Sequence, residues 1–179
     1  MQYQYQYRTA QRGFSLLELL VVVVIIGVIS AIYTLSFGLL DQDREMERDL
    51  ERLVAIIELA SEESMLYGRE MGVRFFSNRY EFSRLDITGE AGPEWVLLSD
   101  DVLRPREFDE RLELELMLEG QDILLRPELE EKEKYQPQIF IYSSGEVTPF
   151  MLSVRPEFTS EGYSIQVNGD GSAEIKRLE

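Results

Sequence analysis

The strongest constraint on this chain is a long apolar run close to its N-terminus. Residues 19–40 read LLVVVVIIGVISAIYTLSFGLL and contain no charged side chain. At about 1.5 Å per residue, a helix of this length reaches across a hydrocarbon layer roughly 30 Å thick. Arg8 and Arg12 precede the run, whereas Asp41 and Asp43 follow it. Because positive charge stays on the cytoplasmic side, the run is predicted to cross a membrane once, with the C-terminal bulk exported.

Composition excludes several classes of function. Acidic residues outnumber basic residues 34 to 18, for a formal charge of −16, so a phosphate-binding surface and a nucleic-acid partner are not expected. The chain has no Cys and no His, which removes thiolate chemistry and the commonest general base and metal ligand. Carboxylates could supply an acid pair like that of a glycosidase, but abundant Glu on a solvated surface is far commoner. We therefore predict no enzyme activity, no cofactor and no metal site.

Three interpretations of the apolar run compete: a secretory signal peptide, a permanent signal anchor and a prepilin leader. A secretory signal is cut beside small residues in an A-x-A-like pattern, and the stretch after Ile29 matches that pattern poorly. A plain signal anchor explains the hydropathy but gives no reason for Glu18, which lies just inside an apolar block that begins at Phe14. Glu18 therefore favours the prepilin leader.

The residues Gly13-Phe14-Ser15-Leu16-Leu17-Glu18 carry a resemblance to a known processing site. A short basic leader, Gly-Phe at the junction and Glu fifth after the cut resemble the type IV prepilins and the pseudopilins of type II secretion. The resemblance implies that a prepilin peptidase cuts after Gly13 and N-methylates Phe14. It also implies that the apolar helix survives cleavage and stays in the cell inner membrane, with the C-terminal domain in the periplasm.

Glu18 is predicted to set the register between packed subunits. Cleavage creates an ammonium on Phe14, and an unpaired carboxylate in a bilayer or helical bundle costs at least a few kcal/mol, so Glu18 needs a partner. In the resembled families that partner is the N-terminal amine of a neighbouring subunit, and one buried polar pair fixes axial register. The alternative is that Glu18 extends into water at the membrane interface. The predicted membrane-anchor residues are Leu19, Val22, Ile25, Ile26, Ile29 and Ile32.

Beyond the membrane segment the helix is predicted to continue as an amphipathic half. An apolar stripe lies on one helical face, and Gly68 is the predicted stop. The stripe consists of Leu50, Leu53, Val54, Ile57, Ala60 and Ser64. The predicted organisation is a leader at residues 1–13, a transmembrane and assembly helix at 14–40, its amphipathic half at 41–68, and a periplasmic antiparallel β domain at 72–179.

Strand signals fill the remainder of the chain. Alternation predicts one hairpin over residues 73–85 around Ser77-Asn78, and a second over residues 112–125 around Gly120. Residues 127–137 lack apolar periodicity and are interpreted as an exposed, mobile loop. Short antiparallel strands are expected at residues 139–142, 148–154, 163–167 and 173–176. Residues 168–171, Asn-Gly-Asp-Gly, are predicted to be a hairpin turn, because the acid spacing of a calcium loop is absent.

Scattered motifs in the C-terminal part resemble one family of minor pseudopilins, the H family (GspH). They are Leu66-Tyr67-Gly68-Arg69, Gly72-Val73-Arg74-Phe75, Trp95-Val96-Leu97-Leu98, Leu103-Arg104-Pro105-Arg106, Leu118-Glu119-Gly120-Gln121 and Ser144-Gly145-Glu146-Val147-Thr148-Pro149-Phe150. The resemblance implies an α+β, type IV pilin-like fold, in which the long N-terminal helix packs on an antiparallel sheet. It also implies a minor subunit of the pseudopilus that exports folded proteins, with the major pseudopilin, tip-complex minor subunits and prepilin peptidase as partners. The alternatives are a minor pilin of a type IV pilus or DNA-uptake filament, and a membrane-anchored binding or enzymatic domain with no filament role.

Overall fold

The computed structural model describes the backbone of residues 16–89, 92–99, 102–130 and 133–178, and side chains within these ranges except at residues 31–42. The chain divides into two compact units, Met1–Gln42 and Asp43–Glu179. Each unit is described below by itself. The first contributes the N-terminal part of helix α1, and the second contains the rest of that helix and all of the described strands.

Helix α1 spans Leu16–Tyr67 and contains no proline. It ends at Gly68, the predicted stop, which has φ of +60°. Such a left-handed residue lets the chain fold back over the last turn, and the amide of Arg69 donates to the carbonyl of Ser64 at 3.2 Å. The Ser64 hydroxyl also donates to the Arg69 carbonyl at 2.7 Å, so both ends of the closing turn are satisfied.

The predicted apolar stripe of the amphipathic half is buried. Leu50, Leu53 and Ala60 are each 0% exposed, and Ile57 is 2% exposed. Ser64 is fully buried and makes the hydrogen bond that closes the helix. The structure adds Met46, Ile56 and Ser61 to this buried face. The stripe prediction is therefore confirmed, with a wider face than the sequence pattern indicated.

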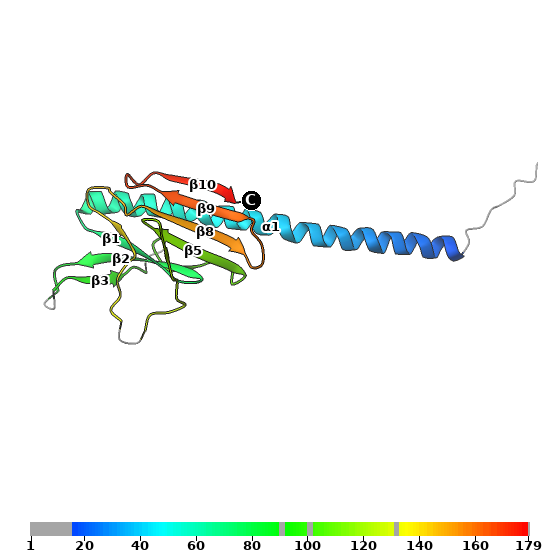
Figure 1. Ribbon diagram of the computed structural model, residues 1–179, viewed down its shortest axis with the longest axis horizontal. Coiled ribbons are helices and arrows are strands. Elements are labelled where there is room, and N and C mark those ends of the chain that lie inside the picture. Colours follow the sequence, from blue (N-terminus) through cyan, green and yellow to red (C-terminus); the bar gives the residue numbers. More distant parts are fainter. Residues whose placement is uncertain (1–15, 90–91, 100–101, 131–132, 179) are drawn as a thin grey trace, which may run out of the picture. The chain divides into compact units, whose positions relative to one another are not determined.

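The strands of the second unit form two antiparallel sheets of five strands each (Figure 1). Sheet A runs in the order β3-β2-β1-β7, with β4 also paired to β2, and sheet B runs in the order β10-β9-β8-β5-β6. The strands of sheet A are β1 (Met71–Phe75), β2 (Arg79–Asp86), β3 (Glu94–Leu97), β4 (Arg106–Glu107) and β7 (Ile139–Ile141). Those of sheet B are β5 (Leu112–Leu118), β6 (Gln121–Ile123), β8 (Phe150–Pro156), β9 (Gly162–Val167) and β10 (Ala173–Leu178).

Three hairpins lie where the sequence predicted them: β1 with β2, β5 with β6, and β9 with β10. Strands β7 of sheet A and β8 of sheet B each pair with a strand that is distant in sequence. Strand β7 pairs with β1 and contacts the residues after it through the bridge between Ile141 and Val147 and through hydrogen bonds between Phe140 and Thr148, while β8 pairs with β5 and β9. Pro149 precedes β8 and has no amide hydrogen to donate, which helps to end pairing there. The chain thus passes from sheet A to sheet B between β4 and β5, returns to sheet A between β6 and β7, and enters sheet B again between β7 and β8.

One hydrophobic core joins the helix to both sheets. Buried side chains of α1, sheet A and sheet B belong to a single cluster that includes Leu53, Phe82 and Leu152. The rings of Phe75 in sheet A and Phe150 in sheet B are 5.7 Å apart, so the two sheets meet directly. Burial of this apolar area supplies the main stabilisation of the unit, at about 25 cal/mol per Å².

The described residues of the segment 127–137, which are 127–130 and 133–137, have no regular structure and are mostly exposed, as predicted. Its ends are nevertheless fixed, because Arg79 donates to the Pro127 carbonyl and Arg74 to the Gln136 carbonyl, each at 2.6 Å. Pro137 is buried, and burial raises the pKa of the Tyr135 phenol to about 12. The prediction of an exposed loop is therefore wrong for these two residues.

Gly72 in β1 has no room for a side chain. A Cβ at this position would lie 2.4 Å from Cβ and 2.5 Å from Cγ of Pro137. Gly72→Ala should lower the free energy of unfolding by about 1–3 kcal/mol, because the anchored segment must move. Thermal unfolding checks this against Gly89→Ala, where the nearest atom would be 3.7 Å away. Equal midpoints for the two variants would contradict the expected strain.

Candidate assembly site

The predicted processing junction, Gly13 and Phe14, lies outside the described residues, as does the side chain of Ile32. Glu18 is described and lies in the first turn of α1, with an exposed side chain. A carboxylate is favoured there, because the backbone N–H groups and the helix dipole give the N-terminal turn a partial positive charge. The structure thus places Glu18 in the first described turn of α1, where a second molecule can reach its carboxylate.

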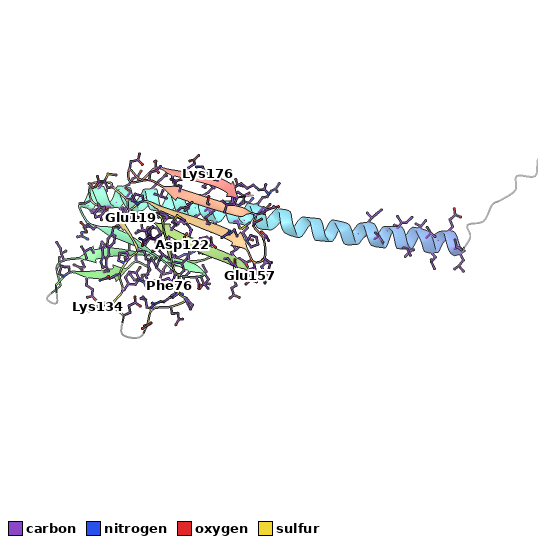
Figure 2. All side chains as sticks on the ribbon, in the orientation of Figure 1. Phe76, Glu119, Asp122, Lys134, Glu157 and Lys176 are labelled. Atoms are coloured by element: carbon purple, nitrogen blue, oxygen red, sulfur yellow. The ribbon has the colours of Figure 1, made fainter. Side chains whose placement is uncertain are left out.

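The apolar residues that follow Glu18 are exposed on every side of the helix (Figure 2). The predicted anchor residues Leu19, Val22, Ile25, Ile26 and Ile29 are 59%, 43%, 51%, 58% and 48% exposed. Other large apolar side chains lie between them, on the remaining faces of this stretch. Soluble proteins rarely expose an apolar surface of this extent, so a cover of lipid or protein is required.

The described part of the chain holds no helix with both the length and the apolar character needed to cross a membrane. The predicted membrane segment, residues 19–40, extends past Ser30 into a stretch whose side chains lie outside the description.

Among the described residues, no group of three or more His, Cys, Asp or Glu side chains is arranged to hold a metal ion. The Asn-Gly-Asp-Gly sequence joins β9 to β10 as the predicted hairpin turn. The Asp170 carboxylate accepts hydrogen bonds from the Ser172 hydroxyl at 2.6 Å and the Ser172 amide at 3.0 Å. These hydrogen bonds lower the pKa of Asp170 and keep its carboxylate occupied within the turn.

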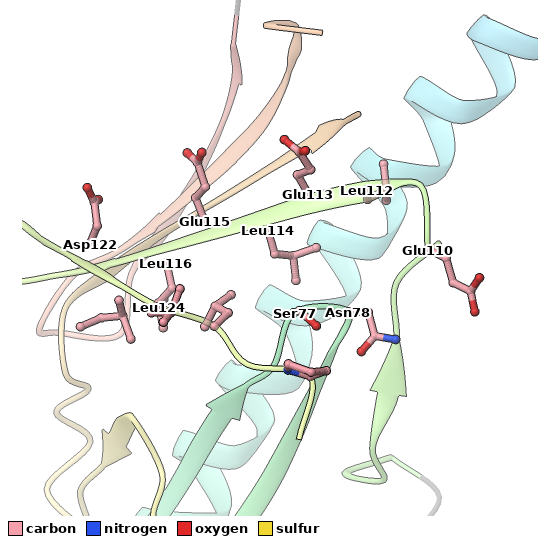
Figure 3. A pocket seen from close by; sticks show the side chains of 13 residues that line it. Ser77, Asn78, Glu110, Leu112, Glu113, Leu114, Glu115, Leu116, Asp122 and Leu124 are labelled. Carbon is pink, nitrogen blue, oxygen red and sulfur yellow. The ribbon is translucent and has the colours of Figure 1, made fainter. Parts of the chain in front are cut away.

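A groove of about 800 Å³ opens beside β5 and β6 (Figure 3). Leu114, Leu116 and Leu124 point into it from above, and Ser77 and Asn78 at the β1–β2 turn lie opposite. Leu124 is 83% exposed, which makes this wall available to an apolar ligand or partner. Glu113, Glu115 and Asp122 also line the groove, and their carboxylates project on the opposite side of the strands from Leu114 and Leu116. No local sequence pattern predicts the groove, because its walls come from the β1–β2 hairpin of sheet A and the β5–β6 hairpin of sheet B.

Comparison with known families gives two matches, one at each end of the chain. The model for the prokaryotic N-terminal methylation motif matches residues 8–34, which include the predicted processing junction and Glu18. The model described as type II transport protein GspH matches residues 49–171, which include most of the second unit.

Curated relatives match over nearly the whole chain. Type II secretion system protein H of Pseudomonas aeruginosa is 37% identical over 166 residues, covering 90% of this chain and 92% of the relative. The protein of the same name from Aeromonas hydrophila is 28% identical over 180 residues, covering 96% of each chain.

Solved structures share the fold. The crystal structure of the minor pseudopilin EpsH from the type II secretion system of Vibrio cholerae matches with a TM-score of 0.60 and 26% identity, covering 76% of this chain and 96% of that one. The solution structure of Escherichia coli GspH matches with a TM-score of 0.56 and 23% identity, covering 77% of this chain and 89% of that one. The first match is an α+β, type IV pilin-like fold, as the sequence predicted, and the second supports the fold alone.

Proposed function

This chain belongs to the GspH family of type II transport proteins, and on that basis we propose that it is a minor pseudopilin subunit of a type II secretion pseudopilus. The observation that carries the proposal is the order of two features on one chain. An N-terminal methylation motif at residues 8–34 leads into a GspH-type domain at residues 49–171. The named relatives favour this function over a minor pilin of a type IV pilus or DNA-uptake filament.

The role is structural rather than catalytic. The second unit offers a rigid core that joins one helix to two sheets, and this core fixes the position of its outer surfaces. The first unit offers an apolar helix that requires a cover. These two features are those expected of a subunit whose helix packs against other subunits and whose folded domain carries the exposed surface.

Processing and anchoring are part of the proposal. A prepilin peptidase cuts after Gly13 and methylates the new amine of Phe14, and residues 14–40 hold the subunit in the inner membrane with its domain in the periplasm. Glu18 then pairs with the terminal amine of a neighbouring pseudopilin. The exposed carboxylate in the first turn and the apolar surface behind it support this arrangement. The partners are the major pseudopilin and the minor subunits of the tip complex.

A measurement of intact mass tests the first proposed step, which is cleavage after Gly13 and methylation of Phe14. The full chain is expressed in cells with and without prepilin peptidase, and its mass is measured after extraction in detergent. With the peptidase, the expected mass lacks residues 1–13 and includes one added methyl group. Without it, the mass should equal that of the full sequence. An unchanged mass in the presence of an active peptidase would contradict processing and, with it, filament assembly.

A further inference from the structure

A small arginine-lined pocket lies where α1 meets β2 and β4 in the second unit. It has a volume of about 370 Å³, and four arginines line it: Arg52, Arg79, Arg104 and Arg106. Only two acidic residues, Asp49 and Glu107, line the same pocket. The concentration is unusual, because the whole chain has 18 basic residues and a formal charge of −16.

Two buried aromatic side chains line this arginine pocket, and they reduce the screening of its charges by water. Tyr80 is 3% exposed and Phe108 is 4% exposed, and their ring centroids are 5.5 Å apart. Charges beside such an apolar floor are screened less than charges in open water. Burial also raises the pKa of Tyr80 to about 12, so its phenol stays a neutral hydroxyl beside the arginines at physiological pH.

Internal partners satisfy only part of the positive charge. Arg52 pairs with Asp49 at 2.8 Å, and Arg79 pairs with Glu81 at 3.0 Å. Arg106 donates from Nη2 to the Val102 carbonyl at 3.2 Å, a neutral acceptor. Its Nε is buried and has no acceptor among the described atoms. An anion that enters the pocket would therefore meet guanidinium groups that carboxylates of the described residues do not fully neutralise.

We propose that the arginine pocket receives a carboxylate side chain from the outer helix face of a neighbouring pseudopilin. The inference rests on the proposed function, because filament packing is what brings a second subunit of this fold alongside. A guanidinium binds a carboxylate through two parallel N–H donors, which gives both strength and direction. Carboxylates of this kind lie on the exposed face of this chain's own helix, where Glu45, Glu51 and Glu58 are all exposed.

Charge reversal within the pocket is the direct test. The full chain, purified in detergent with the other pseudopilins of its secretion system, is compared with Arg104→Glu and Arg106→Glu variants. Each variant should bind the other subunits at least tenfold more weakly, and binding by the unmodified chain should fall as salt rises. Arg111→Glu is the matched control, because Arg111 is 68% exposed, pairs with Asp109 and lies outside the pocket. Unchanged thermal midpoints establish that the variants are folded.

The outcomes separate this inference from the function on which it rests. If the unmodified chain binds no other pseudopilin, the proposed function fails. If it binds them and the Arg104→Glu and Arg106→Glu variants bind equally well, the inference alone fails. A second arm measures thermal stabilisation by inorganic phosphate. Stabilisation of the unmodified chain but not of the variants, with subunit binding unaffected, would overturn the inference in favour of a small-anion site.

Discussion

A Glu18→Ala subunit is expected to remain in the membrane but to be depleted at least tenfold from assembled pseudopilus. The apolar surface that follows Glu18 is unchanged in this variant, so anchoring is preserved. What is lost is the carboxylate that we propose pairs with the terminal amine of a neighbour. Removing one partner of a desolvated charge pair typically costs about 2–5 kcal/mol, and each 1.4 kcal/mol is roughly tenfold in binding.

Quantitative blotting of sheared filaments and of the membrane fraction measures this effect, with secretion of a folded substrate as a second readout. Glu62→Ala is the matched control, because Glu62 is an exposed carboxylate of the same helix outside its first turn. It should leave filament content within about twofold of the unmodified level, as expected for a solvated surface charge. Normal incorporation of the Glu18→Ala subunit would remove the proposed register role and leave the anchor role intact.

A Phe82→Ala variant should lose about 3–5 kcal/mol of unfolding free energy, the largest stability effect that we expect from one core substitution. Phe82 lies in β2, is 0% exposed and contacts the ring of Tyr80 at a centroid distance of 6.0 Å. Truncation leaves a cavity in the cluster shared by the helix and both sheets, where neighbours have little freedom to close it.

Denaturant unfolding of the full chain in detergent, followed by circular dichroism, measures the loss. Phe158→Ala provides the same change of side chain at a residue that is 99% exposed, and should shift the free energy by no more than about 0.5 kcal/mol. Similar shifts for Phe82→Ala and Phe158→Ala would mean that the described core does not carry the stability of the unit.

Local signals predicted helix α1 and most strands of the fold, but not β3 and β4. The helix stripe through Leu50 and Leu53, its end at Gly68 and the hairpin around Ser77-Asn78 all follow from spacing and turn chemistry within a short window. The partners of β7 did not follow, because β1 lies far away in sequence and nothing local to Ile139 identifies it. Strand pairing across the fold depends on the shared core rather than on any one segment.

The same limit applies to the surfaces. The sequence predicts an exposed loop at residues 127–137 and gives no sign of its anchors, because Arg74 and Arg79 belong to distant strands. The arginine pocket was missed for a similar reason, since Arg52 comes from the helix and Arg106 from β4. Glu18, by contrast, was predicted from its place in an apolar block and from the resemblance of the surrounding residues to a processing site. The structure describes it in the first turn of α1, and its role in assembly stays a prediction.

The all-round apolar surface at the start of α1 has a consequence for subunit choice. Lipid tails and apolar side chains solvate such a helix almost equally well, so moving it from bilayer to filament changes the apolar contribution to its free energy very little. Because this transfer of the helix changes its free energy so little, a helix with apolar side chains alone would exchange freely between bilayer and filament. If the subunit functions as proposed, the preference for one destination comes from polar groups such as the Glu18 carboxylate and not from the apolar surface.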